Sequence, residues 1–132
     1  EHTRATRYGH PLTCMVIRIS NAADLAAASE EGTADVAMGS IGAGLKGCIR
    51  AVDHLFRLRR DEFCILLPET DAVGAGYVHR RLQAQVSSGE LWGKALQPEP
   101  AVDISVVSTP ETGVTSGDDL LKKTRHALPR RA

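Results

Sequence analysis

A hairpin near the middle of the chain constrains the fold more than any other feature of the sequence. The runs at about 54–59 and 62–67 each predict a short strand, and the polar turn Arg59-Arg60-Asp61-Glu62 joins them. Strands joined by so short a turn pair in antiparallel orientation. The sequence therefore predicts an antiparallel strand pair, and the other elements must be placed around it.

The segments before the hairpin predict one strand and two helices. Residues 12–19 are a nearly continuous apolar run, which is typical of a central strand. Asn21 is placed to cap an alanine-rich helix over 22–28, and Thr33 to cap a second helix that runs to about Arg50. Spacings of four and five predict the buried face of this second helix, made of Val36, Ile41, Leu45 and Ile49.

The segments after the hairpin predict two helices and one further strand. The segment Pro68-Glu69-Thr70-Asp71 is expected to end the strand and cap a long helix that Gly89 ends, with a buried side made of Tyr77, Val78, Leu82 and Val86. The stretch 91–100 is a loop or a weak edge strand, because two prolines and a glycine interrupt it. Alternation over 101–108 predicts another strand, and a last helix runs over 118–128. The order is βααββαβα in one α/β domain.

Composition is that of a single soluble domain and excludes several functions. The chain has 132 residues, and formal net charge is zero, so it does not attract nucleic acid or a membrane surface as a whole. No apolar run reaches the roughly 18 residues that a membrane span needs. The cysteines stand singly, which is typical of buried thiols in a reducing, cytoplasmic compartment. Residues 1–10 have the appearance of the end of a linker helix, so we expect a larger parent protein.

The hairpin and its surroundings resemble GGDEF domains, the diguanylate cyclases that join two GTP molecules into cyclic di-GMP. The hairpin reads Arg59-Arg60-Asp61-Glu62-Phe63 where the family carries Gly-Gly-Asp-Glu-Phe. The opening residues 7–12 are similar to those before the family's first strand, and an ungapped register places Asp35, Leu45, Arg50, Asp53 and Arg57 at family positions. The resemblance implies a nucleotidyl-cyclase-like domain over 11–132, with a mostly antiparallel five-stranded sheet flanked by helices.

The resemblance also implies that the metal-binding part of the active site is lost. The family holds two Mg²⁺ ions with carboxylates, whereas its two first-strand positions carry Arg18 and Ser20 here. A guanidinium repels a cation, so Arg18 is more damaging than a neutral residue would be. Asp61 keeps the hairpin carboxylate, but Arg59 and Arg60 fill the space where glycines let the backbone approach phosphates.

Positions that bind the nucleotide in the family are altered as well. The guanine-reading asparagine falls on Ala26, a phosphate lysine falls on Ala23, and the Ala-Asp pair of the last helix is Thr124-Arg125. We therefore expect no catalytic residue, no bound metal or other cofactor, and no synthesis of cyclic di-GMP. The vestigial active site would consist of Arg18, Ser20, Asp35, Arg59, Arg60, Asp61 and Glu62.

A second site of the family, the inhibitory product site with the pattern Arg-x-x-Asp, is retained. Arg50 and Asp53 lie at the family's distance before the hairpin, and Arg81 matches an additional arginine one helix later. Arg80 would replace Arg81 if the helix register slips by one residue. An arginine fork can pair with guanine O6 and N7, and a carboxylate can accept from N1 and N2. The resemblance therefore implies a receptor for cyclic di-GMP.

Simpler interpretations of the same residues stay open. Arg50 and Asp53 could form an ordinary surface ion pair, and Arg59 with Arg60 could be a solvated tip or part of a partner surface. Asp35 could pair or cap locally. Four glycines resemble a phosphate loop but lack the Lys-Ser/Thr that follows one, so we interpret them as sites of close helix packing. These are Gly39, Gly42, Gly44 and Gly47.

Three functions are consistent with these observations. The leading hypothesis is a non-catalytic cyclic di-GMP receptor in bacterial signalling, which relays occupancy to fused domains or a protein partner and can dimerise. The second is a ligand-free interaction or dimerisation module with the same fold. The third is a residual cyclase or GTP sensor that uses Asp35, Asp61 and Glu62.

Overall fold

The elements follow one another in the order that the sequence pattern predicts. The computed structural model describes residues 10–28, 35–91, 99–110 and 114–129. Within these residues the order βααββαβα is confirmed. The elements are β1 (Leu12–Ile19), α2 (Ala22–Ala28), α3 (Asp35–Lys46), β2 (His54–Arg59), β3 (Glu62–Pro68), α4 (Ala72–Ser88), β4 (Val102–Ser108) and α5 (Gly117–His126).

The sheet has four strands in the described part of the chain, in the order β2-β3-β1-β4, and every neighbouring pair is antiparallel. The expectation of five strands is therefore wrong for these residues. The weak edge strand considered at 91–100 lies mostly in 92–98, outside the described residues. The hairpin of β2 and β3 is confirmed, with a register shift between Arg57 and Arg59 beside the turn.

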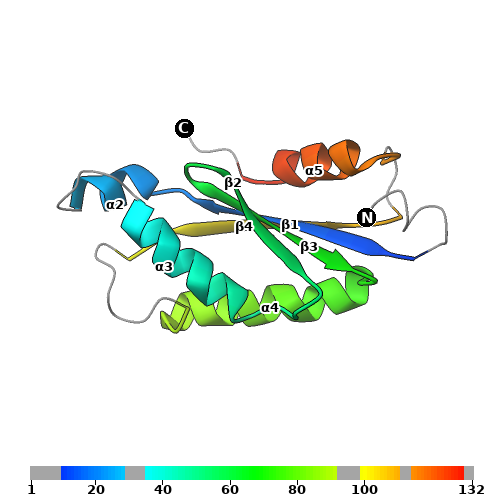
Figure 1. The fold of residues 1–132 in the computed structure, drawn as a ribbon, viewed down its shortest axis with the longest axis horizontal. Helices are drawn as coiled ribbons and strands as arrows, with labels where there is room; N and C mark the ends of the chain where they lie inside the picture. Colours follow the sequence, from blue (N-terminus) through cyan, green and yellow to red (C-terminus); the bar gives the residue numbers. More distant parts are fainter. Residues whose placement is uncertain (1–9, 29–34, 92–98, 111–113, 130–132) are drawn as a thin grey trace.

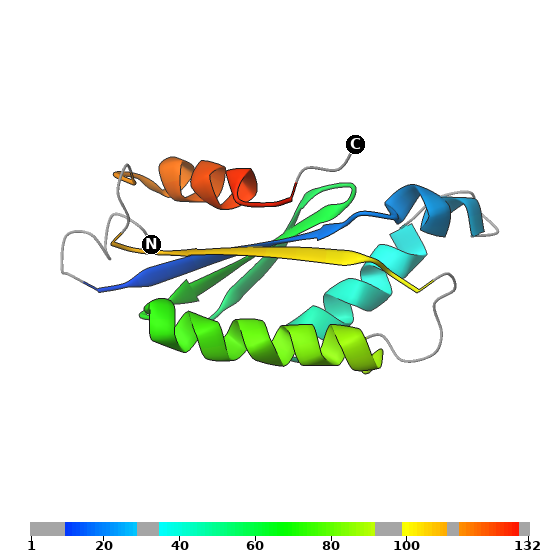
Figure 2. The same ribbon diagram turned by 180° about the vertical axis from the view of Figure 1, so that it is seen from behind.

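Helices cover both faces of the sheet, so that the fold has three layers (Figure 1). The helices α3 and α4 lie on one face and α5 on the other, as the reverse view also shows (Figure 2). The apolar run of β1 serves both faces: Met15, Ile17 and Ile19 belong to the core under α3 and α4, whereas Cys14 and Val16 belong to the core under α5. This explains why β1 is buried along nearly its whole length.

Two expected core residues are instead exposed. Val36 on α3 and Tyr77 on α4 have exposed fractions of 63% and 66%. Each lies five residues before its buried partner, Ile41 or Leu82, and five residues turn a helix by about 500°, about 140° away from that face. The buried face of α3 instead follows a spacing of four residues, since Ala37, four residues before Ile41, is buried. The helix α3 also ends at Lys46, earlier than the expected Arg50.

The helix caps decide where α4 and α5 begin and where α4 ends. Asp71 accepts from the backbone N–H of Gly74 as predicted, and Gly89 ends α4 with φ of 76°. Ser116 caps α5, whose first residue is Gly117. The side chain of Asn21 differs from the predicted cap. It donates to the carbonyl of Glu99 and accepts from the backbone N–H of Ala101, and so ties the start of α2 to the segment that leads into β4. The other expected cap, Thr33, lies outside the described residues.

Candidate functional site

Arg50 and Asp53 form a close ion pair at the loop between α3 and β2. The Nη2 of Arg50 donates to Asp53 Oδ1 at 2.7 Å, and Nε donates to both carboxylate oxygens at 3.1 and 3.2 Å. The backbone N–H of Arg50 donates to Oδ2 at 2.7 Å. The Asp53 side chain is only 1% exposed, whereas that of Arg50 is 52% exposed. A buried carboxylate thus fixes the direction of a half-exposed guanidinium.

Further contacts tie Arg50 to the start of α4. Its Nη2 donates to the carbonyl of Pro68 at 3.1 Å and to Thr70 Oγ1 at 2.9 Å. The hydrogen bonds to Asp53 raise the pKa of Arg50 above its usual value, so the guanidinium stays charged. In the described part of the chain, Nη1 is the guanidinium nitrogen that carries none of these bonds.

Arg50 lines a groove of about 560 Å³ between the end of α3 and the start of β2. We call it the Arg50 groove; its walls are Lys46, Ile49, Arg50, Ala51, Asp53, His54, Leu55 and Phe56. Lys46 and Arg50 are two cations against the one buried carboxylate of Asp53, so these walls carry a net positive charge. Lys46 and His54 were not identified from the sequence, because neither belongs to a motif and only the turn of the chain brings them here.

Arg81 lies close to the Arg-x-x-Asp segment, and Arg80 does not contact it. The Nη2 of Arg81 donates to the carbonyl of Cys48, two residues before Arg50. Arg80 instead donates to Gly76 O at 3.3 Å and lies over the ring of Tyr77, with Cζ 5.1 Å from the centroid. The structure therefore joins Arg50 to Asp53 directly and ties Arg81 to Cys48, although Arg81 is not among the residues that line the Arg50 groove, and it directs Arg80 along the outside of α4.

The first-strand position of the vestigial site carries a balanced cluster of charges on the face under α5. Arg18 lies opposite Glu62 of β3 and opposite Asp103 of β4 in the strand registers. Its Nη2 lies 3.4 Å from Asp103 Oδ2 and donates to the carbonyl of Pro129. Glu62 accepts from Arg125 of α5 at 2.9 and 3.3 Å. Asp103 was not identified from the sequence, because its contact with Arg18 depends on strand register.

Hydrogen bonds from an arginine side chain stabilise the turn at the tip of the hairpin. Arg57 donates to the carbonyls of Arg59 and Arg60 at 3.3 and 2.7 Å, and it pairs with Asp35 at 3.3 Å. Local pairing of Asp35 is therefore confirmed. Arg59 and Arg60 are exposed, and Asp61 is partly buried, with its carbonyl accepting from the backbone N–H of Ile19 at 2.8 Å.

Ser20 ends β1 on the surface and donates to Ala101 O at 3.2 Å. This bond joins the end of β1 to the segment that leads into β4. The vestigial residues therefore serve local structure in different places: Ser20 at the end of β1, Asp35 at the start of α3 and Arg18 under α5.

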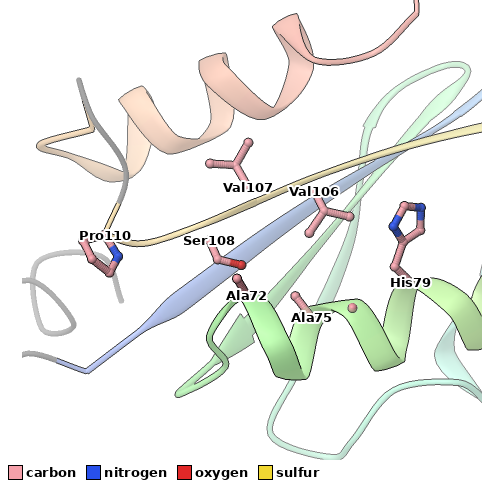
Figure 3. Close-up of a pocket in the computed structure, with 8 residues that line it drawn as sticks. Ala72, Ala75, His79, Val106, Val107, Ser108 and Pro110 are labelled. Atoms are coloured by element: carbon pink, nitrogen blue, oxygen red, sulfur yellow. The ribbon is translucent and has the colours of Figure 1, made fainter.

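A second hollow, of about 450 Å³, lies between α4 and the edge strand β4 (Figure 3). His79 projects from α4 toward Val106, while Ala72 and Ala75 face Ser108 and leave space there (Figure 3). None of the candidate site residues lines this hollow. It is therefore separate from both the Arg50 groove and the vestigial site.

Comparison with known families decides the identity of the fold. The family model described as "Diguanylate cyclase, GGDEF domain" matches residues 1–131. The chain belongs to the GGDEF domain family. No curated protein matches it.

Solved structures agree with the GGDEF assignment. The active GGEEF domain of a diguanylate cyclase from Vibrio cholerae is 19% identical, with a TM-score of 0.78 over 96% of this chain and 79% of that one. The GGDEF domain of DgcB from Caulobacter crescentus in complex with c-di-GMP is 14% identical, with a TM-score of 0.77 over 95% and 74%. At such identities the likeness establishes the fold.

A third similar structure comes from a complex. Diguanylate cyclase SiaD from Pseudomonas aeruginosa, in complex with its activator SiaC, is 20% identical with a TM-score of 0.69. The alignment covers 97% of this chain but 52% of SiaD, so this GGDEF domain spans about half of that protein's length. In the described residues, no helix of this domain is long and apolar enough to cross a membrane.

Proposed function

We propose that this GGDEF domain is a non-catalytic receptor for cyclic di-GMP, which it binds through Arg50 and Arg81 and reports to attached domains or to a partner protein. One observation carries the proposal: the half-exposed guanidinium of Arg50 is held by a buried carboxylate in a positively charged groove of about 560 Å³. A groove of this volume falls in the range of small-molecule sites. The complex of DgcB with c-di-GMP is a precedent for the ligand on this fold.

Arginine is suited to both parts of such a ligand. Its planar fork pairs with the O6 and N7 atoms of guanine, and its charge attracts the phosphodiester. At Arg50 a bound guanine would replace the bonds of Nη2 to Pro68 and Thr70 and would add one from Nη1. Arg81 would exchange its bond to the Cys48 carbonyl for one to the ligand.

We assign Asp53 mainly a positioning role. Its carboxylate is buried and already accepts four bonds from Arg50, so direct acceptance from guanine N1 and N2 would first require it to release that side chain. Holding the fork in advance lowers the entropy cost of binding. Asp53→Ala should therefore weaken binding although Asp53 keeps few atoms at the surface.

The absence of catalysis is part of the proposal and rests on the surroundings of Arg18. A divalent cation needs several oxygen ligands, and the residues here do not suit one, because a guanidinium lies between Asp103 and Glu62. The second carboxylate of the pair, Glu62, is already bound to Arg125. Exposed Arg59 and Arg60 further crowd the turn where the family keeps glycine.

Isothermal titration calorimetry with cyclic di-GMP tests the proposal. The intact domain should bind, and Arg50→Ala should weaken binding by about 100-fold, because two charge-assisted hydrogen bonds of about 1.5 kcal/mol each are lost. Arg59→Ala removes the same charge from an exposed hairpin position and is the matched control. Absence of heat with the intact, folded protein would end the receptor proposal, and loss of binding in Arg59→Ala alone would move the site to the hairpin.

A ligand-free interaction module is supported by a different surface. Val73 and Tyr77 lie one turn apart on α4 with 68% and 66% exposure, and Arg80 lies over the tyrosine ring. Such an aromatic and arginine pair is typical of protein interfaces. If the domain acts in this way, Tyr77→Ser should reduce its self-association, measured by light scattering, or its binding to attached domains, measured by pull-down. Arg50→Ala should leave both unchanged.

A residual cyclase or GTP sensor is the remaining alternative. Incubation with GTP and Mg²⁺ or Mn²⁺, followed by chromatography, should give no cyclic di-GMP. Formation of the product would replace our proposal with an active enzyme, whatever the calorimetry shows.

A further inference from the structure

Two of the three cysteines lie against each other in the core under α5. The Sγ atoms of Cys14 on β1 and Cys64 on β3 are 3.6 Å apart, although the residues are 50 positions apart in the sequence. The strand register places Cys14 opposite Leu66 and Val16 opposite Cys64, so the two thiols are diagonal neighbours on one face of the sheet. Both residues are buried, with exposed fractions of 0% and 1%.

A small apolar cavity lies beside both cysteines. It has a volume of about 220 Å³ and lies between the sheet and the first turns of α5. Besides the cysteines, its walls are mainly Leu12, Phe56, Leu66, Leu120 and Leu121. Engineered apolar cavities of about 150 Å³ admit benzene, so this one has room for a small organic molecule.

The hydrogen bond between the two thiols shifts their pKa values in opposite directions. A hydrogen bond from Cys64, supported by one from Thr124, lowers the pKa of Cys14 in spite of burial. The same hydrogen bond, burial and the charge on Cys14 raise the pKa of Cys64, which keeps its proton. Cys48 provides a contrast within the chain, because burial raises its pKa and its thiol donates to Gln85 Oε1 at 2.9 Å.

We propose that Cys14 and Cys64 form a dithiol site that is oxidised to a cross-strand disulfide by small organic hydroperoxides entering the apolar cavity. The thiolate of Cys14 attacks the outer peroxide oxygen, which gives a sulfenic acid and an alkoxide that takes up a proton to become the alcohol. The Cys64 thiol then attacks this sulfur, the S–S bond forms and water leaves. Two thiols lose two electrons, and the hydroperoxide is reduced to alcohol and water.

The geometry allows this step without a large rearrangement. A disulfide bond is about 2.05 Å long, so the sulfurs must approach by roughly 1.5 Å. A local shift of the two strands must accompany rotation of the side chains, because diagonal neighbours on a sheet lie farther apart than residues directly opposite each other. The bond would form four residues from Arg18 along β1 and two residues from Glu62 along β3, on the same face of the sheet as the cluster that holds α5.

Trypsin separates the three cysteines, which makes the test direct. Cys14, Cys48 and Cys64 fall in the peptides 8–18, 47–50 and 61–80. The whole chain is treated with tert-butyl hydroperoxide, unfolded, alkylated with N-ethylmaleimide and digested. Mass spectrometry should find peptides 8–18 and 61–80 linked, while peptide 47–50 stays alkylated. The proposal is overturned if Cys48 oxidises first, if the link joins two chains, or if all thiols stay alkylatable at doses that oxidise glutathione.

Three variants separate the roles of the second thiol and of the cavity. In Cys64→Ala the reaction should stop at the sulfenic acid of Cys14, which dimedone traps. Leu121→Trp should fill the cavity and slow oxidation on the order of tenfold, equivalent to about 1.4 kcal/mol of added barrier, while Leu121→Met conserves volume and should not. Equal rates in both Leu121 variants would show that the cavity is not the route, which contradicts the proposal.

Discussion

At the scale of single residues, Arg18 belongs to a cluster of charges that lies between the sheet and α5. It is one of four charges, with Glu62, Asp103 and Arg125, that together sum to zero beneath α5. The two carboxylates are nearly buried, at 6% and 7% exposure, so each depends on its arginine. In the described part of the chain, Arg18 Nε has no hydrogen-bond partner, so charge balance rather than full hydrogen bonding holds this residue.

Placing a carboxylate at this position should be costly. Arg18→Asp places a third negative charge opposite Glu62 and Asp103, and we expect unfolding free energy to fall by about 3–5 kcal/mol. Arg18→Met keeps the apolar stem without the added negative charge and should lose less. Urea denaturation at neutral pH measures both. Equal losses would mean that packing of the stem, and not charge, makes Arg18 important.

At the scale of elements, glycines let α3 approach its neighbours closely. A Cβ on Gly44 would lie 2.0 Å from the carbonyl oxygen of Leu91, and one on Gly42 would lie 3.2 Å from the ring of Phe63. The interpretation of close packing is thus confirmed at these two positions. At Gly39 a Cβ would meet nothing within 4 Å, so no contact explains this glycine.

Two substitutions in the same helix should therefore have opposite effects. Gly39→Ala adds helix propensity and should raise unfolding free energy by up to about 1 kcal/mol. Gly44→Ala forces the backbone apart at Leu91 and should lower the unfolding free energy by more than Gly39→Ala raises it. Thermal unfolding followed by circular dichroism distinguishes them. A neutral or stabilising Gly44→Ala would show that α3 and the Leu91 segment separate easily.

The start of α5 provides a prediction about pH. Hydrogen bonds from the hydroxyl and then the backbone N–H of Thr115 lower the pKa of Asp119 below its ordinary value of 3.8. The folded state therefore binds the proton less readily than the unfolded state, so this stabilisation is present above about pH 4 and is lost as pH falls through the folded pKa. Asp119→Asn should make acid destabilisation shallower in unfolding titrations. Asp118→Asn removes the same charge one residue earlier and is the control.

At the scale of the whole molecule, the Arg50 groove and the charge cluster of Arg18 occupy different parts of the fold. The groove lies at the loop where α3 passes into β2, and the cluster lies beneath α5. Occupation of the groove therefore need not involve the residues that the family uses for catalysis. The bonds of Arg50 to Pro68 and Thr70 connect the groove to the start of α4, which would carry any signal to the exposed face of that helix.

Ligand binding should also raise the melting temperature of the whole domain. At a cyclic di-GMP concentration 100 times Kd, binding adds about 2.7 kcal/mol, which corresponds to about 10 °C for a chain of this length. Differential scanning calorimetry should record this shift in the intact domain and in Arg59→Ala, but not in Arg50→Ala. A shift of the same size in Arg50→Ala would place the ligand elsewhere.

The sequence by itself determined the element order, the hairpin, the capping segment 68–71, the stop at Gly89, and the family. The elements and their ends depend on local periodicity and on backbone preferences of a few neighbouring residues, which a linear pattern records, whereas the family follows from the resemblance of the hairpin and its surroundings. The same reasoning was wrong for Val36 and Tyr77, where a spacing of five residues leaves the buried face.

Only the tertiary structure decided which distant side chains meet. Strand register brings Arg18 to Asp103 and Cys14 to Cys64, across 85 and 50 positions of sequence. It also turned Asp53 inward to hold Arg50, where the motif alone left an ion pair and a ligand site equally open. Register and chain reversal arise from packing of the whole sheet between its helices, so no short stretch of sequence contains them.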